Sequence, residues 1–293
     1  MIIGSNGMLG QNLTSYFMFK RDVELFCTSF EKESFFSDVN YSQIDISSSR
    51  EVKKIMSDFI PDVVINAAAY TNVDGCESER ELAWKINVTG VENLVKYVKR
   101  YDSHLIHISS DYIFRGTDGP YEENDLPNPI SYYGKTKLAG ENVIVSSNIT
   151  YTIIRTNVLY GPTKFGRPDF VKWVVHSLRK NENIRIVNDQ FNNPTYIEDL
   201  ITAIAKVVEK RKKGIYNIGG AEVLSRLGFT NKIADYFKLD KSLISEIITA
   251  QLNQPAPRPL KSGLINLLAE AELDYKPLKI DDTLFLMKRY LNN

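Results

Sequence analysis

The chain has 293 residues, of which 43% are hydrophobic and 25% charged, and its 36 Lys and Arg residues balance 36 Asp and Glu residues. This composition indicates a soluble globular protein of one large domain or two closely packed ones, and its charge favours neither nucleic acid nor a membrane as a partner. No apolar run approaches a membrane span, no signal peptide is evident, and the two cysteines fit no metal or disulfide framework, so we expect a cytoplasmic protein without a metal site.

The first predicted element is a very short strand at residues 1–3, followed at once by Gly4, Gly7 and Gly10 and by apolar residues at helical spacing. Strand, glycine turn and helix are typical of the first unit of a dinucleotide-binding fold. Glycine lets the backbone approach a pyrophosphate, and the helix N-terminus supplies amide groups. The spacing G-x-x-G-x-x-G differs from the commoner G-x-G-x-x-G, so a glycine turn without a ligand is nearly as good an interpretation.

The second predicted strand covers residues 23–28, and its end bears on the choice of cofactor. An acid there would bind the ribose 2′-hydroxyl of NAD, whereas an arginine nearby would accept the 2′-phosphate of NADP. The chain has Thr28 and Ser29 at this end and Lys32 three residues later, so neither signature is present. These residues can donate to a phosphate and no acid stands there to repel it. We therefore expect a shallow preference for NADP(H), with NAD(H) also usable.

Two further stretches are candidates for the cofactor site. Asp45 and Ile46 can border the adenine, although a helix N-cap region before residues 49–59 is an equally good interpretation. Residues 63–66 form an apolar strand followed by Ala67, Ala68 and Ala69, and such small residues let a flat cofactor lie against the carboxyl edge of the sheet.

One long helix is predicted over residues 77–100, with Leu82 and Ile86 among its inward-facing residues. Asn87 lies within it. This residue either reaches the catalytic region or is a buried structural asparagine, and the sequence favours neither.

The stretch from Ser109 to Glu141 carries the chemistry. If residues 131–146 are helical, Tyr133 and Lys137 lie one turn apart on the same face. A nearby ammonium lowers the pKa of a phenol, so the pair can exchange a proton with a carbonyl or alcohol oxygen. Ser110 follows the predicted strand 104–109 and can hydrogen-bond the same oxygen. Tyr132 lacks a lysine at this spacing, and Tyr-x-x-x-Lys alone is a weak signal that many surface helices share.

The remaining elements predict an α/β fold, with a doubly wound parallel Rossmann sheet and a smaller α/β C-terminal lobe. Strands are expected at residues 150–156 and within 214–220, and helices at 170–178 and 196–208, with a polar loop at 188–195. We assign residues 1–156 to the Rossmann domain, with 184–218 returning to it. Residues 157–183 and 219–293 form the substrate-binding lobe.

Six segments together resemble the extended short-chain dehydrogenase/reductases, and more narrowly the dTDP-4-dehydrorhamnose reductase family. They are GSNGMLGQ, VVINAAAYTNVD, HISSDYIFRGTDGPYEENDLPNPISYYGKTKLAGE, RTNVLYG, VNDQFNNPTYIEDL and RPLKSGL. The resemblance implies an NAD(P)-binding domain and a lobe that binds a nucleotide-linked sugar. The family usually has threonine at Ser110, and serine keeps the hydroxyl.

By this resemblance, the catalytic residues are Ser110, Tyr133 and Lys137. The residues in contact with the cofactor would be Gly4, Gly7, Met8, Leu9, Gly10, Asp45, Ile46, Ala67, Ala68, Ala69, Tyr133 and Lys137, with Ser29 at the 2′-position. Asp111 and Tyr112 would hold the sugar, and Arg258 would meet the nucleotide phosphates. Val158 stands where rhamnose enzymes of the family often carry a tryptophan that packs on the sugar, which leaves the exact sugar open.

The resemblance implies NAD(P)H-dependent reduction of the C4 keto group of a nucleotide-linked 6-deoxysugar, with dTDP-4-dehydro-L-rhamnose as the leading substrate. A 4-ketoreductase for another nucleotide sugar is a second hypothesis. A third is a cofactor-binding regulatory subunit like that of methionine adenosyltransferase, which resembles the same family. A homodimer is left open.

Overall fold

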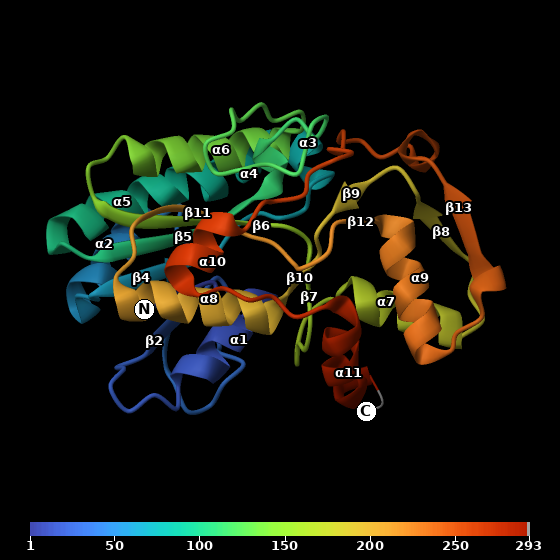
Figure 1. Ribbon diagram of the computed structural model, residues 1–293. Coiled ribbons are helices and arrows are strands. Elements are labelled where there is room, and N and C mark those ends of the chain that lie inside the picture. The colour runs from blue at the N-terminus through green and yellow to red at the C-terminus, as the bar shows by residue number, and fades with distance from the viewer. Residues whose placement is uncertain (292–293) are drawn as a thin grey trace.

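The computed structural model describes residues 1–291, and a parallel seven-stranded sheet forms its centre (Figure 1). The strands lie in the order β11-β6-β5-β4-β1-β2-β3. Their bounds are Ile2–Ile3 (β1), Phe26–Ser29 (β2), Asn40–Gln43 (β3), Val63–Asn66 (β4), His104–Ser110 (β5), Thr150–Thr156 (β6) and Gly214–Ile218 (β11). The order reverses between β1 and β4, where doubly wound sheets bind ligands at the carboxyl ends of the strands. The predicted Rossmann fold is confirmed.

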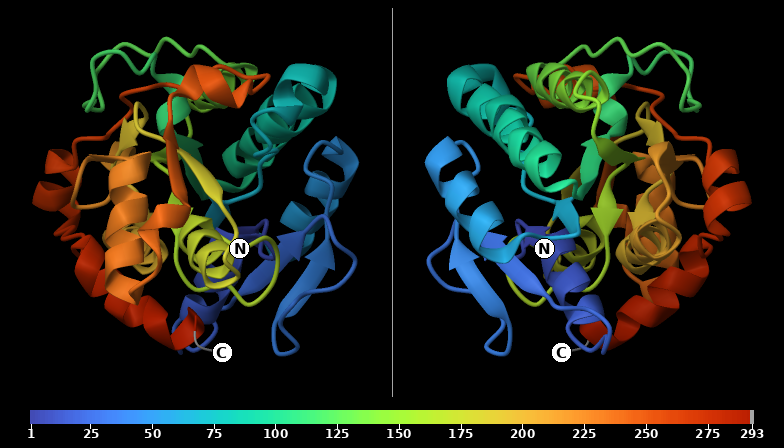
Figure 2. Two further views of the ribbon diagram at one scale, coloured as in Figure 1. Left: turned by 90° about the vertical axis from the view of Figure 1, so that its right-hand side faces the viewer. Right: turned by 90° about the vertical axis from the view of Figure 1, so that its left-hand side faces the viewer.

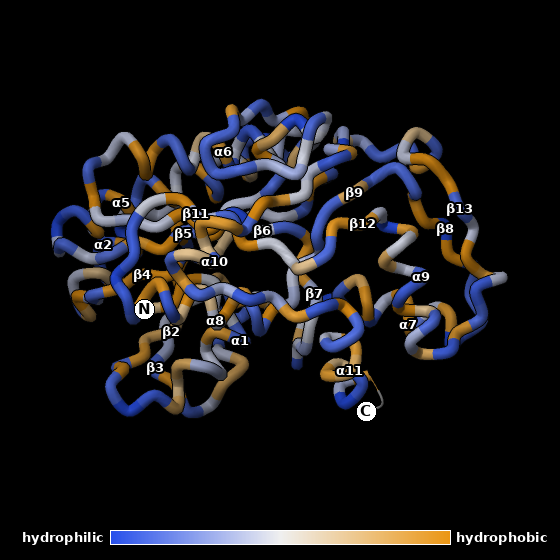
Figure 3. The backbone as a smooth tube through the Cα atoms, in the orientation of Figure 1, coloured by the Kyte–Doolittle hydropathy of each residue, from blue (hydrophilic) through white to orange (hydrophobic). Residues whose placement is uncertain are grey.

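Helices cover both faces of this sheet, as the end-on views show (Figure 2). One face carries α1 (Met8–Phe17), α8 (Ile197–Lys210) and α10 (Leu267–Leu273), and the other carries α2 (Ser49–Phe59), α5 (Gly90–Tyr101) and α6 (Tyr132–Val145). The central strands are therefore apolar on both sides, and they stand out as hydrophobic against the hydrophilic outer loops (Figure 3).

The predicted single helix at residues 77–100 is wrong. The chain instead forms α3 (Gly75–Ser78), α4 (Arg80–Trp84), a π-helical turn (Lys85–Thr89) and then α5. The break is at Glu79, whose backbone is not helical, and Leu82 is 41% exposed rather than inward-facing. Asn87 lies in the π-helical turn, a feature often found near functional sites.

The smaller lobe has its own core, built from α7 (Phe170–Arg179), β8 (Ile184–Val187), α9 (Arg226–Phe237), β13 (Ile244–Ile247) and α11 (Ile280–Leu291). Two short strand pairs connect it to the sheet. They are β7 (Leu159–Tyr160) with β10 (Thr195–Tyr196), and β9 (Phe191–Asn192) with β12 (Leu224–Ser225). Short 3₁₀ turns lie at Asp111–Ile113, Lys241–Leu243 and Thr249–Leu252.

The segment 184–218 contributes to both parts of the molecule. Its α8 packs on α1 and its β11 pairs with β6, while its β8 pairs with β13 of the smaller lobe. The division of the chain into two domains at the residues given above stays a prediction.

Candidate active site

A pocket of about 520 Å³ opens at the carboxyl edge of β1, β2 and β4. Most of the predicted cofactor residues line it, namely Gly4, Gly7, Ser29, Asp45, Ile46, Ala67, Ala68 and Ala69. Met8, Leu9 and Gly10 lie in the first turn of α1 beneath it, and the Leu9 side chain packs in the core of the sheet. Phe30, Tyr70, Lys85 and Ile86 also line the pocket, and sequence reasoning did not assign them to it.

Close backbone packing, both within the glycine turn and against the residues after β4, requires Gly4 and Gly10. Gly4 has a φ of +81°, and a Cβ on it would lie 2.8 Å from the amide nitrogen of Ala68. A Cβ on Gly10 would lie 2.0 Å from the Gly4 carbonyl oxygen, so both positions require glycine. Gly7 is exposed and directly precedes α1, which leaves the helix N-terminus accessible to a phosphate.

An acid does stand at the end of β2, contrary to the sequence-based expectation. Glu31 lines the pocket, and its carboxylate accepts a hydrogen bond of 2.5 Å from the Ser29 hydroxyl. Thr28 is buried and donates to the Ile2 carbonyl instead of facing a ligand. Glu31 was overlooked because it comes two residues after the strand, and only the turn that follows brings it back toward Ser29.

The three predicted catalytic residues come from adjoining elements, as expected. Ser110 is the last residue of β5, and α6 begins after Ser131, whose hydroxyl caps it by accepting from the Gly134 amide. Tyr133 and Lys137 lie one turn apart on α6, and both are buried. The Ser110 hydroxyl donates to Asp111 over 3.0 Å, and the Lys137 ammonium donates to the Ile108 carbonyl over 2.7 Å.

Burial sets the protonation of this group. It raises the pKa of the Tyr133 phenol well above its usual value; the Ser110 hydroxyl opposes this shift, and the Asp111 charge adds to it. Burial also lowers the pKa of the Lys137 ammonium to about 8, although Glu141 acts in the opposite direction. The phenol therefore stays protonated at neutral pH. The lower phenol pKa that we expected from the spacing to Lys137 is wrong, because burial dominates and the Lys137 ammonium donates to the Ile108 carbonyl.

Asn87 holds this region together. Its side-chain oxygen accepts from the Tyr70 amide over 2.8 Å, and its amide group donates to the Tyr70 carbonyl and to the Thr136 hydroxyl. Because Thr136 lies between the two catalytic residues of α6, this buried asparagine fixes the position of that helix. The structure therefore favours the structural interpretation of Asn87.

The predicted sugar contacts differ in accessibility. Tyr112 lies beside Tyr133, with the ring centroids 5.5 Å apart in an edge-on arrangement. Asp111 is 2% exposed, and its carboxylate accepts from Ser262 over 2.6 Å as well as from Ser110. Burial raises the pKa of Asp111 to about 6, against the effect of these hydrogen bonds. The Asp111 carboxylate thus ties the catalytic strand to the chain near Arg258.

Val158 lies between β6 and β7, and Arg258 lies between the turn at Thr249–Leu252 and α10. Both segments border the smaller lobe. The Arg258 guanidinium forms a 2.8 Å ion pair with Asp74 and donates to the Ala256 carbonyl. Val158 is partly exposed, and its carbonyl accepts from the Thr195 amide. Their contacts with a substrate stay predictions.

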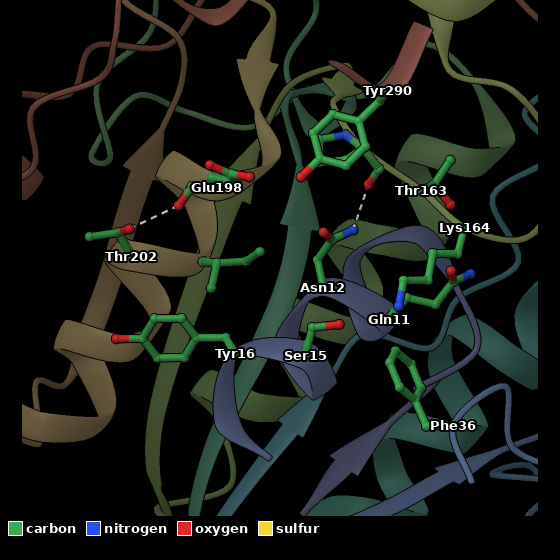
Figure 4. A pocket seen from close by; sticks show the side chains of 12 residues that line it. Gln11, Asn12, Ser15, Tyr16, Phe36, Thr163, Lys164, Glu198, Thr202 and Tyr290 are labelled. Carbon is green, nitrogen blue, oxygen red and sulfur yellow. Dashed lines mark hydrogen bonds between the residues drawn. The ribbon is translucent and has the colours of Figure 1, made fainter. Parts of the chain in front are cut away.

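A second pocket, of about 450 Å³, lies between α1, α8 and the loop that follows β7 (Figure 4). It is bordered by Asn12, Tyr16, Lys164 and Tyr290, and Asn12 donates across it to the Pro162 carbonyl. It contains none of the predicted site residues. Within residues 1–291 we find no cluster of three metal-binding side chains and no helix of the length and apolarity that a bilayer crossing requires.

Three relatives share about a third of their residues with this chain. A dTDP-4-dehydrorhamnose reductase of Aggregatibacter actinomycetemcomitans is 32% identical, over 90% of this chain and 89% of its own. A probable low-salt glycan biosynthesis reductase, Agl14, of Haloferax volcanii is 31% identical, over 97% and 95% of the two chains. Methionine adenosyltransferase 2 subunit beta of Xenopus tropicalis is 33% identical, over 75% and 67%.

Solved structures agree with these matches. The dTDP-4-dehydrorhamnose reductase of Clostridium acetobutylicum superposes with a TM-score of 0.87 at 30% identity, covering 100% of this chain and 99% of its own. That of Bacillus anthracis, in complex with NADP, gives 0.83 at 28% identity, over 99% and 98%. The family model described as RmlD substrate binding domain matches residues 1–287, and the chain therefore belongs to this family.

Proposed function

We propose that the protein is an NAD(P)H-dependent reductase of the C4 keto group of a nucleotide-linked 6-deoxysugar, converting dTDP-4-dehydro-L-rhamnose to dTDP-L-rhamnose. The observation that carries this proposal is the position of Tyr133 and Ser110. Both lie at the carboxyl edge of the sheet, beside a glycine-lined pocket that fits a dinucleotide. The three similar proteins named as dTDP-4-dehydrorhamnose reductases support the choice of substrate.

The residues have distinct roles in the reaction. The reduced cofactor, when bound, supplies a hydride to C4. Tyr133 donates its phenolic proton to the oxygen on which negative charge develops, and its raised pKa keeps that proton available at neutral pH. Ser110 redirects its hydroxyl from Asp111 to the same oxygen and stabilises the charge. Lys137 holds the nicotinamide ribose and adds a positive charge near the phenol.

The substrate extends from this point toward the smaller lobe. Tyr112 and Val158 border the sugar, and Arg258 pairs with the phosphates that follow it. Without the tryptophan expected at Val158, the sugar pocket is wider, so recognition depends more on the nucleotide end.

We also propose that the protein works in the cytoplasm, where its two free thiols, Cys27 and Cys76, stay reduced. A homodimer stays a prediction.

Both NADP(H) and NAD(H) serve as cofactor in this proposal, and Glu31 sets the balance between them. We expected a preference for NADP(H) because we identified no acid at the end of β2. That argument no longer holds, because Glu31 places a carboxylate beside Ser29, where a 2′-phosphate would lie. Replacing Glu31→Gln should therefore raise the affinity for NADPH relative to NADH by about fivefold, the effect of one charge of about 1 kcal/mol. Fluorescence titration of both cofactors measures this ratio, and an unchanged ratio would show that Glu31 does not face the ribose.

The decisive experiment is a cofactor-oxidation assay with a panel of nucleotide-linked 4-keto sugars. We expect turnover with dTDP-4-dehydro-L-rhamnose, and product analysis by NMR should show an alcohol at C4. Turnover only with another sugar would support the reductase activity but assign a different substrate to it. The relative named methionine adenosyltransferase 2 subunit beta supports a second candidate, a regulatory subunit. That function would be indicated by tight cofactor binding without turnover of any sugar in the panel.

A further inference from the structure

Arg226 is a cation that lacks a counterion. It is the first residue of α9, partly buried, and its guanidinium carbon lies 4.5 Å from the centre of the Phe170 ring. Among residues 1–291, no carboxylate lies within ion-pair distance of it and its guanidinium makes no hydrogen bond. The buried Arg155, by contrast, pairs with Glu141 over 2.7 Å. Withdrawing a guanidinium from water without a partner is unfavourable, so the position needs an explanation.

The backbone places Arg226 close to Arg258. Ser225 of β12 pairs with Phe191 of β9, and the Arg226 amide donates to the Gln190 carbonyl. On the other side of β9, the Phe191 amide donates to the Leu260 carbonyl. Arg226 follows β12, which runs antiparallel to β9, whereas Arg258 precedes a segment that runs parallel to it. Both arginines therefore lie at the end of this ladder where β9 begins.

This end of the ladder faces the candidate active site. Ser262, in the same segment as Arg258, donates to Asp111, the residue that follows Ser110. Tyr112 comes next and contacts the ring of Tyr133. The charges are coupled: Arg258 and Arg226 both lower the pKa of the Tyr112 phenol, against the larger opposing effect of burial. Arg258 also lowers the pKa of Arg226, as expected for two cations that repel each other.

We propose that Arg226 and Arg258 together bind the diphosphate of the nucleotide-linked substrate. The diphosphate is attached to the sugar whose C4 oxygen Tyr133 protonates. This inference rests on the proposed function, and it adds a second phosphate-binding residue to that site. The N–H groups of the Arg226 guanidinium make no hydrogen bond within residues 1–291 and can pair with phosphate oxygens, whereas Arg258 exchanges Asp74 for them. Two planar guanidinium groups in close proximity suit an anion with two adjacent charged groups, because each can pair with a different phosphate.

The cofactor's own phosphates do not account for this pair. The pocket that fits the dinucleotide is lined by the glycine turn, Ser29 and the alanines after β4, and neither arginine lines it. Arg226 belongs instead to the smaller lobe, and the sugar end of the site lies between that lobe and the cofactor pocket. The chemistry therefore points to the anion that is attached to the substrate.

The test compares Arg226→Gln with Arg185→Gln, because Arg185 is an exposed arginine of the same lobe that donates only to the Gln251 carbonyl. Calorimetry on the protein saturated with NADP⁺ measures the binding of dTDP, dTMP and thymidine. We expect Arg226→Gln to weaken dTDP binding by about 10–100-fold, dTMP binding less, and thymidine binding by less than about twofold. The control should bind all three as the wild type does. In the reductase assay, KM should rise more than kcat falls.

Wild-type binding of dTDP by Arg226→Gln would overturn the proposal, as would an equal loss of affinity for dTDP and thymidine, which would indicate a purely structural role. If this variant does not fold, Arg226→Lys replaces it. That change keeps the charge and removes the fork, so the ratio of thymidine to dTDP dissociation constants should still fall several-fold. An unchanged ratio would contradict the proposal. The binding of dTDP is measured without turnover. If no sugar of the panel were reduced, the reductase function would be disproved, but the dTDP affinities would still test the role of Arg226.

Discussion

At the scale of single residues, the candidate site depends on close packing between α6 and the turn after β5. A Cβ on Gly134 would lie 2.1 Å from the Tyr112 carbonyl oxygen, so only glycine allows this approach. The approach brings Tyr133 beside Tyr112 and Ser110. The Tyr-x-x-x-Lys spacing could be predicted from the sequence because it lies within one helix. Glu31 and Arg226 could not, because a turn or a strand register brings each of them to the site.

The first test at this scale is Tyr133→Phe. The ring still packs against Tyr112, but the transferable proton is gone, so kcat should fall by about 10²–10⁴-fold while cofactor affinity stays within about twofold. Tyr132→Phe is the matched control. Tyr132 interacts with Arg80 through its ring, which the substitution keeps, so its turnover should be nearly normal. Near-normal turnover of Tyr133→Phe would disprove its assignment as the proton donor.

At the scale of elements, α6 is attached to β6 by a buried ion pair. The Arg155 guanidinium and the Glu141 carboxylate are 2.7 Å apart, each side chain is only 3% exposed, and Arg155 also donates to the Glu123 carbonyl. The pair therefore connects the helix that carries the catalytic residues to the neighbouring strand. Long periodic elements such as α6, β5 and β6 were predicted within a residue or two. The helix over 77–100 was not, because neither the non-helical backbone of Glu79 nor the π-helical turn at Lys85–Thr89 changes the apolar spacing on which the prediction depended.

We expect Glu141→Ala to lower the free energy of unfolding by about 3–5 kcal/mol, since it leaves a buried guanidinium without its counterion. Urea denaturation, followed by circular dichroism, measures the change. Asp235→Ala serves as the control, because Asp235 and its partner Lys241 are both exposed and such pairs contribute about 1 kcal/mol or less. Equal changes for the two variants would mean that the buried pair contributes no more than a surface pair.

At the scale of the whole molecule, His104 links β5, β6 and the start of β11. Its Nε2 lies 2.8 Å from the Thr152 hydroxyl, which itself donates to the Lys212 carbonyl, so the Nε2–H of His104 is the donor. Burial, together with the smaller effects of the charges of Lys213 and Arg211, lowers the pKa of His104 to about 4, so its ring is neutral at neutral pH. Between about pH 6.5 and 4 the unfolded chain therefore binds a proton that the folded chain does not, and this group makes folding less favourable as the pH falls.

The difference in unfolding free energy between the wild type and His104→Gln isolates this effect. Glutamine can still donate to Thr152 but does not titrate. Asp111, whose raised pKa has the opposite effect between about pH 6 and 4, is present in both proteins and cancels. The variant should gain stability relative to the wild type as the pH is lowered from 6.5 to 4, with a constant difference above pH 7. A difference that does not change with pH would show that His104 titrates normally.

The path of the chain between β6 and β11 also determines which fragments of the protein can fold on their own. These strands are neighbours in the sheet, yet α7, β8 and α8 come between them in the sequence. A fragment that ended at residue 156 would lack β11 and α8, so β6 would become an open edge and one apolar face of the sheet would lose its cover. Open edges of this kind pair with other chains. We expect such a fragment to form inclusion bodies, and the nucleotide-binding half cannot serve as a separate module.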